Sequence, residues 1–206
     1  MKHIKFIFIS LLLSTNANAI IIGFDDLEYS DNLVHTVGGV YTQDGFNIFT
    51  DISPEFSWSF YGSSNSNYAG SAGIFTNGGT GTGGYIYYRE SPGADTEYFN
   101  ISSVDIARAY MDNYASFSVT FYGQFYDGRP NVSQTFFIDG SSNTFETFYF
   151  NEEFKGIMQL FWYSGGNPQA QFDNFNVSVV PIPAPIILFC SGLLGLIGFI
   201  KKNNAH

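Results

Sequence analysis

The sequence has few side chains suited to cross-linking or catalysis. Its 206 residues contain one cysteine, Cys190, so an intramolecular disulfide is excluded. Of its three histidines, only His35 lies away from the two ends. One imidazole cannot build a zinc cluster, and it supplies at most one catalytic triad. Carboxylate pairs arise by chance among eighteen acidic residues. The sequence therefore predicts a protein without enzymatic activity.

Basic residues are also scarce. The chain carries eight Lys and Arg against eighteen Asp and Glu, a formal net charge of −10. All eighteen acidic residues fall between residues 20 and 180, and only four basic residues lie there: Arg89, Arg108, Arg129 and Lys155. This region alone therefore carries a formal net charge of −14. A surface this negative repels phosphate backbones, which excludes nucleic acid as a partner.

Residues 20–180 are poor in helix formers and rich in strand and turn formers. The chain has 23 Phe, 14 Tyr and 22 Gly. Apolar residues alternate at period two in several runs, including Phe56 to Phe60, Phe117 to Phe121, Met158 to Trp162 and Phe175 to Val179. Turn pairs separate such runs at Asp44-Gly45, Asp127-Gly128 and Asp139-Gly140. The pattern predicts one all-β domain, an antiparallel β-sandwich resembling a jelly roll, with about eight to ten short strands.

Residues 62–84 break this pattern. The segment is rich in Gly, Ser and Asn and shows neither a helix period nor a sustained strand period. It predicts a long surface loop, either a binding loop or a tolerated connection, with one short strand at Gly73 to Thr76. No helix or lysine follows its glycines, so a phosphate cradle is not expected.

The N-terminus has the features of a signal peptide. Lys2 and Lys5 flank the start of an apolar run from Phe6 to Leu13, and Ala17-Asn18-Ala19 supplies small residues for a signal peptidase. Residues 1–19 are therefore predicted to be removed, so that the mature chain begins at Ile20. The alternative, a transmembrane anchor, requires a longer apolar run.

The C-terminus, residues 181–206, combines a proline hinge, an apolar segment and a basic end. Three prolines spaced by one residue favour extended chain, and Ile186 to Ile200 carries no charge. Fifteen residues reach roughly 22 Å as a helix against a hydrocarbon core of ~30 Å, which predicts a marginal single transmembrane helix. Lys201 and Lys202 are expected on the cytoplasmic side, which places the domain across the membrane. A buried C-terminal helix is the alternative, and Cys190 is either an acylation site or an inert buried thiol.

The residues of this tail closely resemble the PEP-CTERM sorting signal. The resemblance rests on Val180-Pro181-Ile182-Pro183-Ala184, on Ser191-Gly192-Leu193-Leu194-Gly195-Leu196 and on the basic pair Lys201-Lys202, with Ile182 where the name-giving Glu would stand. It implies an exported protein of a Gram-negative bacterium that makes exopolysaccharide. It also implies that exosortase, a membrane-embedded sorting protease, reads the tail. Val180, Pro181, Ile182 and Pro183 would then form the processing region, and the tail would anchor the protein only until it is cleaved.

Three stretches resemble the β-sandwich domains that commonly precede such tails: 23–27, 119–128, and a closing run of 154–162 followed by 170–177. Domains of this kind are similar to the jelly rolls of carbohydrate-binding modules, in which the first and last strands lie side by side. That adjacency would bring Asp25 and Asp26 near Asp173, where carboxylate and carbonyl oxygens could supply a structural calcium site. The alternative is that these acids cap turns at strand ends.

Two functions follow from the sequence. The first is a non-enzymatic protein of the cell surface or extracellular matrix, associated with exopolysaccharide or biofilm. The second is a calcium-stabilised carbohydrate-binding module with the same tail. An outward-facing aromatic platform would favour the second, whereas wholly buried aromatic residues would favour the first. Tyr85, Tyr87 and Tyr88 are the candidates for stacking on sugar rings.

Overall fold

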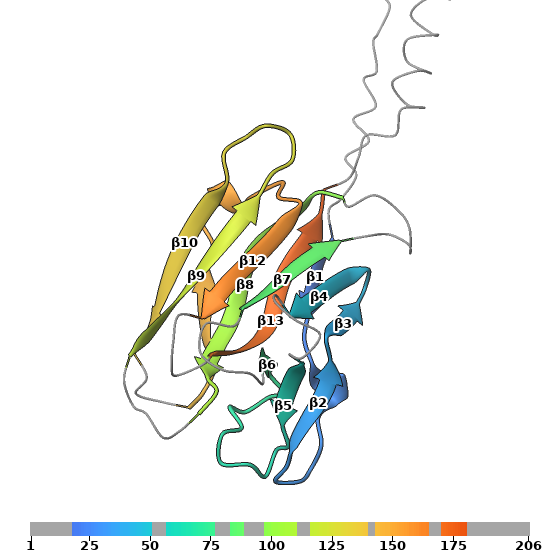
Figure 1. Cartoon of the computed structure of the whole chain (residues 1–206), viewed down its shortest axis with the longest axis vertical. Coiled ribbons are helices and arrows are strands. Elements are labelled where there is room, and N and C mark those ends of the chain that lie inside the picture. Colours follow the sequence, from blue (N-terminus) through green and yellow to red (C-terminus); the bar gives the residue numbers. More distant parts are fainter. Residues whose placement is uncertain are drawn as a thin grey trace, which may run out of the picture. The chain divides into compact units, whose positions relative to one another are not determined.

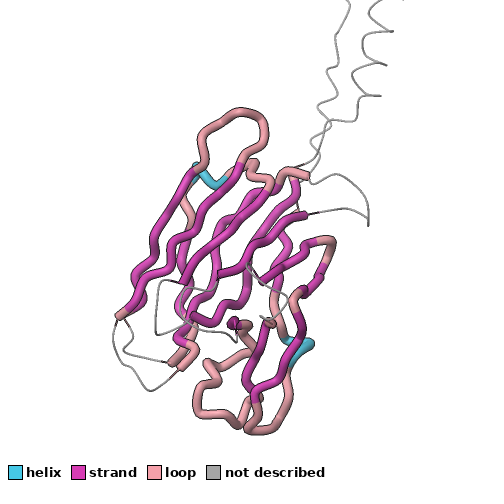
Figure 2. The backbone as a smooth tube through the Cα atoms, in the orientation of Figure 1, coloured by secondary structure: helices cyan, strands magenta, loops and turns pink. Residues whose placement is uncertain are grey.

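The computed structural model describes residues 18–50, 57–76, 83–88, 97–110, 116–139, 143–164 and 170–180. The described residues consist almost entirely of strands and loops, with two single turns of 3-10 helix (Figure 2). Ala17, the residues of the tail from Pro181 onwards and the predicted transmembrane helix at 186–200 lie outside the described residues. No helix in the described ranges combines the length and apolar character needed to cross a membrane.

Thirteen strands are described, against the eight to ten expected, because short strands such as Val34–Gly38 and Val40–Gln43 lack a long alternating run. The strands are β1 Ala19–Ile22, β2 Val34–Gly38, β3 Val40–Gln43, β4 Phe46–Thr50, β5 Trp58–Tyr61, β6 Phe75–Thr76, β7 Gly83–Tyr88, β8 Phe99–Arg108, β9 Phe117–Gln124, β10 Val132–Ile138, β11 Glu146–Tyr149, β12 Gln159–Ser164 and β13 Ala170–Val179. The 3-10 turns are η1 Asp25–Leu27 and η2 Glu152–Phe154.

The strands form an antiparallel β-sandwich, as the alternating pattern predicts. A six-stranded sheet has the order β10-β9-β12-β7-β4-β3, and a four-stranded sheet has the order β1-β13-β8-β11. Figure 1 shows the six-stranded sheet in front of the four-stranded one, with a small third sheet, β2-β5-β6, beside their lower end. Asp44 and Gly45 both have positive φ, 49° and 82°, in the tight turn between β3 and β4, which confirms that predicted turn.

Aromatic side chains fill the space between the two large sheets. Strand β9 alternates buried and partly buried residues along its whole length, as expected of a strand with one core face. Trp162 lies among Phe121, Phe172 and Phe175, at centroid distances of 5.2 to 5.7 Å. Because Gly84 has no side chain, Trp58 and Trp162 can pack directly beneath β7. The two indoles and their neighbouring phenylalanines are thus in direct contact at the centre of the core.

The glycine-rich segment is less free than its composition predicts. Ala69, Ala72 and Ile74 are buried, and Ile74 exchanges backbone hydrogen bonds with Phe172 of β13. The short strand expected at Gly73 to Thr76 is present as β6. Small residues are therefore needed in the part of this segment that is described, because it packs closely against the sandwich.

Strand β5 also differs from its expected alternation. All four of its residues, Trp58 to Tyr61, are buried. Pairing with β2 and β6 protects its edges, while its two faces contact the sandwich core and a second small cluster around Phe75 and Ala109. Alternation in sequence fails here because both faces of the strand are covered.

Candidate functional site

The first and last strands of the domain lie side by side, as the resemblance implies. Strand β1 pairs antiparallel with β13, with Ala19 opposite Ser178 and Ile22 opposite Phe175. Cleavage after Ala19 would leave Ile20 to Ile22 in this ladder. Val180 ends the domain by donating its N–H to the carbonyl of Tyr98, at 2.9 Å.

A β-bulge in β13 places Asp173 in a buried position. The ladder between β13 and β8 shifts register between Asp173 and Asn176, and Asn174 adopts a left-handed conformation with φ 46°. The Asp173 side chain accepts hydrogen bonds from the Ser71 hydroxyl and from the Asn174 N–H. The residue is only 1% exposed, and this burial, followed by the charges of Asp25 and Asp105, raises its pKa to about 6.

The predicted acids lie around Gly23, at the end of β1. A Cβ on Gly23 would lie 3.8 Å from Asp173 Oδ1 and 4.0 Å from Asp25 Oδ2. Tyr41 donates a 2.8 Å hydrogen bond to Asp26 Oδ1, and burial together with the nearby acids strongly raises the pKa of its hydroxyl. The structure therefore brings Asp25, Asp26 and Asp173 to one end of the sandwich.

Asp105 belongs to the same region, although sequence reasoning did not single it out. It lies opposite Asp173 in the β13–β8 ladder and accepts hydrogen bonds from Thr147 at 2.6 Å and Asn174 at 2.9 Å. Only the strand register reveals this neighbour. Within the described ranges, no three Asp, Glu, His or Cys side chains form a group able to hold a metal ion.

A second candidate site is the outer face of the six-stranded sheet. A row of rings crosses its strands β4, β7, β12 and β9, because the registers set Phe49 opposite Tyr85, Tyr85 opposite Phe161, and Phe161 opposite Tyr122. Phe137 of β10 lies on the same face outside this row. Tyr87 and Tyr163 extend this row along β7 and β12. The six rings are partly or well exposed, and we call them the aromatic face: Phe49, Tyr85, Tyr87, Tyr122, Phe161 and Tyr163.

The rings of the aromatic face are ordered in two stacks. Tyr122 and Phe161 lie parallel within 10°, with centroids 4.7 Å apart. Phe49 stacks on Tyr85 at 5.0 Å and 5°, and on Tyr87 at 5.1 Å and 20°. Such stacks fix the orientation of the rings relative to one another.

Tyr88 does not belong to this face. Strand β7 alternates, so Tyr88 points to the opposite side from Tyr85 and Tyr87 and packs on Phe46, with ring centroids 4.8 Å apart. Of the three tyrosines considered for stacking on sugar rings, Tyr85 and Tyr87 therefore lie on the outer face, and Tyr88 lies on the core side.

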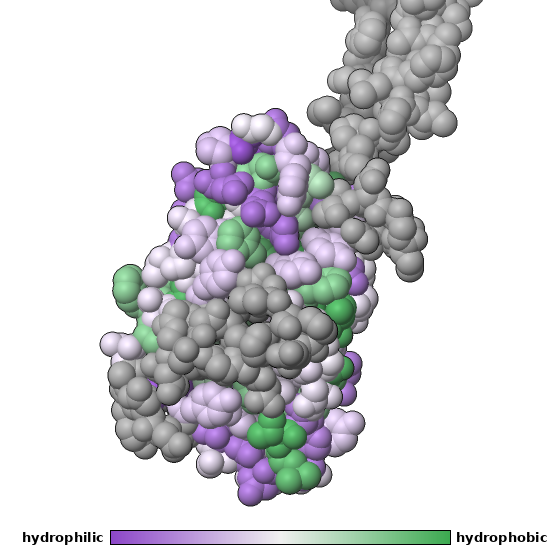
Figure 3. All heavy atoms as spheres, viewed as in Figure 1, coloured by the Kyte–Doolittle hydropathy of each residue, from purple (hydrophilic) through white to green (hydrophobic). Residues whose placement is uncertain are grey.

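The remaining described strand positions on this outer face are uncharged. On the coloured surface in Figure 3, purple hydrophilic residues gather at the upper and lower ends, and pale and green residues lie between and beside them. Hydroxyl and amide groups surround the rings, and several bond to one another, as Thr120 does to Thr135 at 2.9 Å. The polar residues of the face are Thr42, Asn47, Ser118, Thr120, Gln124, Ser133, Thr135 and Gln159.

His35, the one histidine in the described ranges, packs against aromatic side chains and bonds to an acidic one. Its ring contacts those of Tyr29 at 4.5 Å and Phe60 at 5.0 Å, and its Nε2 lies 2.9 Å from Asp31 Oδ1. The hydrogen bond with His35 lowers the pKa of the Asp31 carboxyl. Tyr29 and Phe60 also contact each other, with ring centroids 5.7 Å apart, so the three rings form one small cluster.

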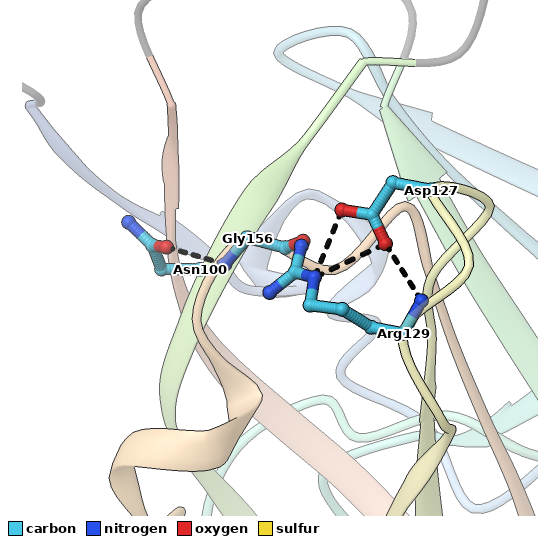
Figure 4. Close-up of polar contacts among 4 residues, drawn as sticks. All are labelled: Asn100, Asp127, Arg129 and Gly156. Carbon is cyan, nitrogen blue, oxygen red and sulfur yellow. Dashed lines mark hydrogen bonds and ion pairs between the residues drawn. The ribbon is translucent and has the colours of Figure 1, made fainter.

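Cations on the described surface are engaged in local contacts. Arg129 bonds to Asp127 Oδ2 at 2.8 Å and to the carbonyl of Gly156 at 3.0 Å, while Gly156 donates its N–H to Asn100 (Figure 4). The Arg129 guanidinium also lies 3.9 Å from the centroid of the Phe125 ring. Lys155 pairs with Glu152. These contacts fix the β9–β10 turn against the loop before β12.

No family model matches the chain, and no curated protein matches it. Solved structures that resemble it include two carbohydrate-binding modules. A mutant of a family 29 carbohydrate-binding module is 11% identical with a TM-score of 0.42, and the match covers 80% of this chain and 93% of that chain. A family 11 carbohydrate-binding module from Clostridium thermocellum, in complex with a β-1,3-1,4-mixed-linked tetrasaccharide, is 10% identical with a TM-score of 0.35, covering 71% of this chain and 95% of that chain. At these low sequence identities and TM-scores, the similarity concerns the arrangement of the strands alone.

Proposed function

We propose that residues 20–180 form a non-catalytic carbohydrate-binding domain of an exported protein, and that the aromatic face binds the polysaccharide. The observation that supports this most directly is the row of ordered rings across four adjacent strands, at partly exposed positions. The outer face of an antiparallel sheet is commonly solvated and polar. Aromatic rings gathered on such a face mark a surface for contact with another molecule.

The chemistry of the face suits sugars. A pyranose ring carries apolar C–H groups, which pack on aromatic rings, and hydroxyls, which need hydrogen-bond partners when water is displaced. The stacks Tyr122–Phe161 and Phe49–Tyr85 supply the first kind of contact. The amides of Gln124 and Gln159 beside them supply the second.

The test is affinity electrophoresis of the mature protein through gels that contain soluble polysaccharides. The double variant Tyr122→Ala/Phe161→Ala should lose at least about tenfold in affinity, because each stacking contact is worth about 0.5 to 1.5 kcal/mol beyond area burial. Tyr149→Ala is the matched control, since Tyr149 is 73% exposed on β11 of the other sheet. Equal retardation of wild type and the folded double variant would contradict the proposal.

We further propose, from the tail sequence, that the protein is exported and sorted to the cell surface or extracellular matrix, where it associates with exopolysaccharide or biofilm. The membrane would hold it through the 186–200 helix until exosortase cuts near Val180 to Pro183. The intact mass of protein from outside a host with its exosortase should correspond to a start at Ile20 and a lost tail. The same full-length, membrane-bound form in hosts with and without exosortase would leave a plain anchor as the correct interpretation.

Calcium at Asp25, Asp26 and Asp173 remains a proposal, supported by the meeting of these acids around Gly23. Calcium requires an ionised Asp173, so binding would oppose the raised pKa of this carboxyl and would weaken below about pH 6. Millimolar calcium should raise the melting temperature at neutral pH in wild type but not in Asp26→Asn. An unchanged wild-type melting temperature would exclude the site.

A further inference from the structure

We propose that the aromatic face selects an uncharged polysaccharide over acidic or amino-bearing ones. This inference rests on the proposed function and adds the chemical class of the ligand. It is based on the positions of the charged residues in this acidic protein.

Charge is absent from the described strand positions on the outer face of the six-stranded sheet, although the chain has eighteen acidic residues. The described acids gather elsewhere. Asp25, Asp26, Asp105 and Asp173 lie where β1, β8 and β13 meet, whereas others lie in turns, such as Asp127. On the described strands of this face, the rings are therefore flanked by hydroxyl and amide side chains and by no charged one.

An acidic polysaccharide would find no suitable cation on the described surface. Arg108 is 2% exposed, Arg129 bonds to Asp127, and Lys155 pairs with Glu152. The net charge of −14 on residues 20–180 also repels a polyanion over the distance of a Debye length. Carboxylate and sulfate groups would lose water at this surface without gaining a charge-assisted bond.

An amino-bearing polysaccharide is also a poor match. Ammonium groups are best held by carboxylates, and the described strands of this face present none beside the rings. Hydroxyl and acetamido groups, in contrast, pair with the side-chain amides of Asn47, Gln124 and Gln159 without any charge. The complementary ligand is thus neutral.

The length of the row indicates an oligosaccharide or longer chain. Strands β4, β7, β12 and β9 are consecutive in the sheet, and neighbouring strands lie ~4.8 Å apart, so the row spans about 14 Å. A single sugar covers only part of that distance. Affinity should therefore rise from a monosaccharide to oligosaccharides of the same sugar.

The experiment compares one polysaccharide backbone in three charge states. Hydroxyethyl, carboxymethyl and quaternary-ammonium celluloses, and dextran with its sulfate and diethylaminoethyl derivatives, are titrated calorimetrically into the mature protein at about 0.02 M and about 0.5 M NaCl. At least one neutral polymer should bind, with a Kd that changes less than about twofold with salt. At the higher salt, its charged derivatives should bind more weakly than the neutral parent, and Tyr122→Ala/Phe161→Ala should abolish binding.

The outcomes separate this inference from the proposed function. Tighter binding of a charged derivative at about 0.5 M NaCl, lost in the ring variant, would overturn the neutral class and keep the carbohydrate-binding function. Binding to no polymer, neutral or charged, would overturn both. A wild-type dimer that the ring variant converts to a monomer would identify the face as a self-association surface and would also overturn both.

Two further variants control for folding and for the kind of contact. Tyr149→Ala should bind like wild type, since its ring lies on an edge strand of the other sheet. Tyr85→Phe keeps a stacking ring and removes one hydroxyl, so it should retain neutral-polymer binding within about threefold. Loss of binding in Tyr85→Phe equal to that in the double ring variant would contradict binding by stacking.

Discussion

At the residue scale, Asp173 lies in an environment that disfavours a charged carboxylate. It is buried, it faces Asp25 and Asp105, and the partners it has in the structure are the Ser71 hydroxyl and the Asn174 N–H rather than a cation. Desolvation disfavours its charged form, which is why its pKa rises to about 6. A carboxyl of this kind couples folding to pH.

Asp173 should make the protein more stable as pH falls from 7 to about 4. Because its folded pKa of about 6 lies above the ordinary 3.8, its contribution is fully present below the unfolded pKa and is lost as pH rises through 6. The free energy of unfolding of wild type relative to Asp173→Asn should fall by about 2 to 3 kcal/mol between pH 4 and pH 7. Urea titrations of both proteins across this range measure it. Parallel profiles would show that Asp173 does not titrate differently in the two states.

Gly84 is the residue whose substitution should most directly disturb the core. A Cβ there would lie 2.6 Å from Trp58 carbons and 2.7 Å from Trp162 Cζ2. Since neither indole can move without displacing other rings, Gly84→Ala should cost about 1 to 3 kcal/mol in the free energy of unfolding. Ser118→Ala, on the outer face of β9, is the control and should stay within about 0.5 kcal/mol. A neutral Gly84→Ala would mean that the two tryptophans can separate.

At the element scale, the bulge in β13 links the core to the acidic end of the sandwich. Phe172 and Phe175 are three residues apart, yet both point into the core. The extra residue between them changes the alternation and turns Asp173 and Asn174 toward β8 and the segment that holds Ser71. One backbone irregularity thus positions both a hydrophobic pair and a polar network.

Substitutions of Asn174 separate the backbone and hydrogen-bond parts of the bulge. Asn174→Ala puts an ordinary side chain at φ 46° and removes the bond to Asp105, which should cost about 1 to 3 kcal/mol. Asn174→Gly removes only the bond and should cost about 1 kcal/mol less than Asn174→Ala. Thermal and urea denaturation of the two variants provide the comparison. Equal losses in both would show that the left-handed conformation is not under strain.

Elements with a local signal could be predicted from sequence, and those fixed by pairing could not. The alternation of Phe117 to Phe121 predicts β9 and its core face correctly, and Asp44-Gly45 predicts its turn. The position of Asp105 beside Asp173 could not be predicted, because only the β13–β8 register sets the two residues opposite each other. The outward stacks were likewise hidden, because period two shows which residues share a face but not which face is solvated.

At the scale of the whole molecule, the first and last strands of the domain depend on each other, because β1 and β13 are paired. Strand β13 lies between β1 and β8 and contributes Phe172 and Phe175 to the core. Its removal would expose the edges of two strands and open the aromatic cluster at the same time. No local segment can replace these contacts.

A truncation test follows from this arrangement. Residues 20–180, produced without either end, should unfold in one cooperative transition with little helix by circular dichroism. Residues 20–164, which lack β13, should show no such transition and should be cleaved rapidly by protease. A cooperative transition in the shorter chain would mean that the six-stranded sheet folds without its partner sheet.

The pairing of β1 with β13 also sets the order of events during synthesis. The first strand of the domain leaves the ribosome long before its partner, the last strand, so the four-stranded sheet cannot close until residue 179 is available. Contacts between such distant residues also form slowly. A chain that is still being synthesised therefore lacks the closed four-stranded sheet, which forms only once β13 has left the ribosome.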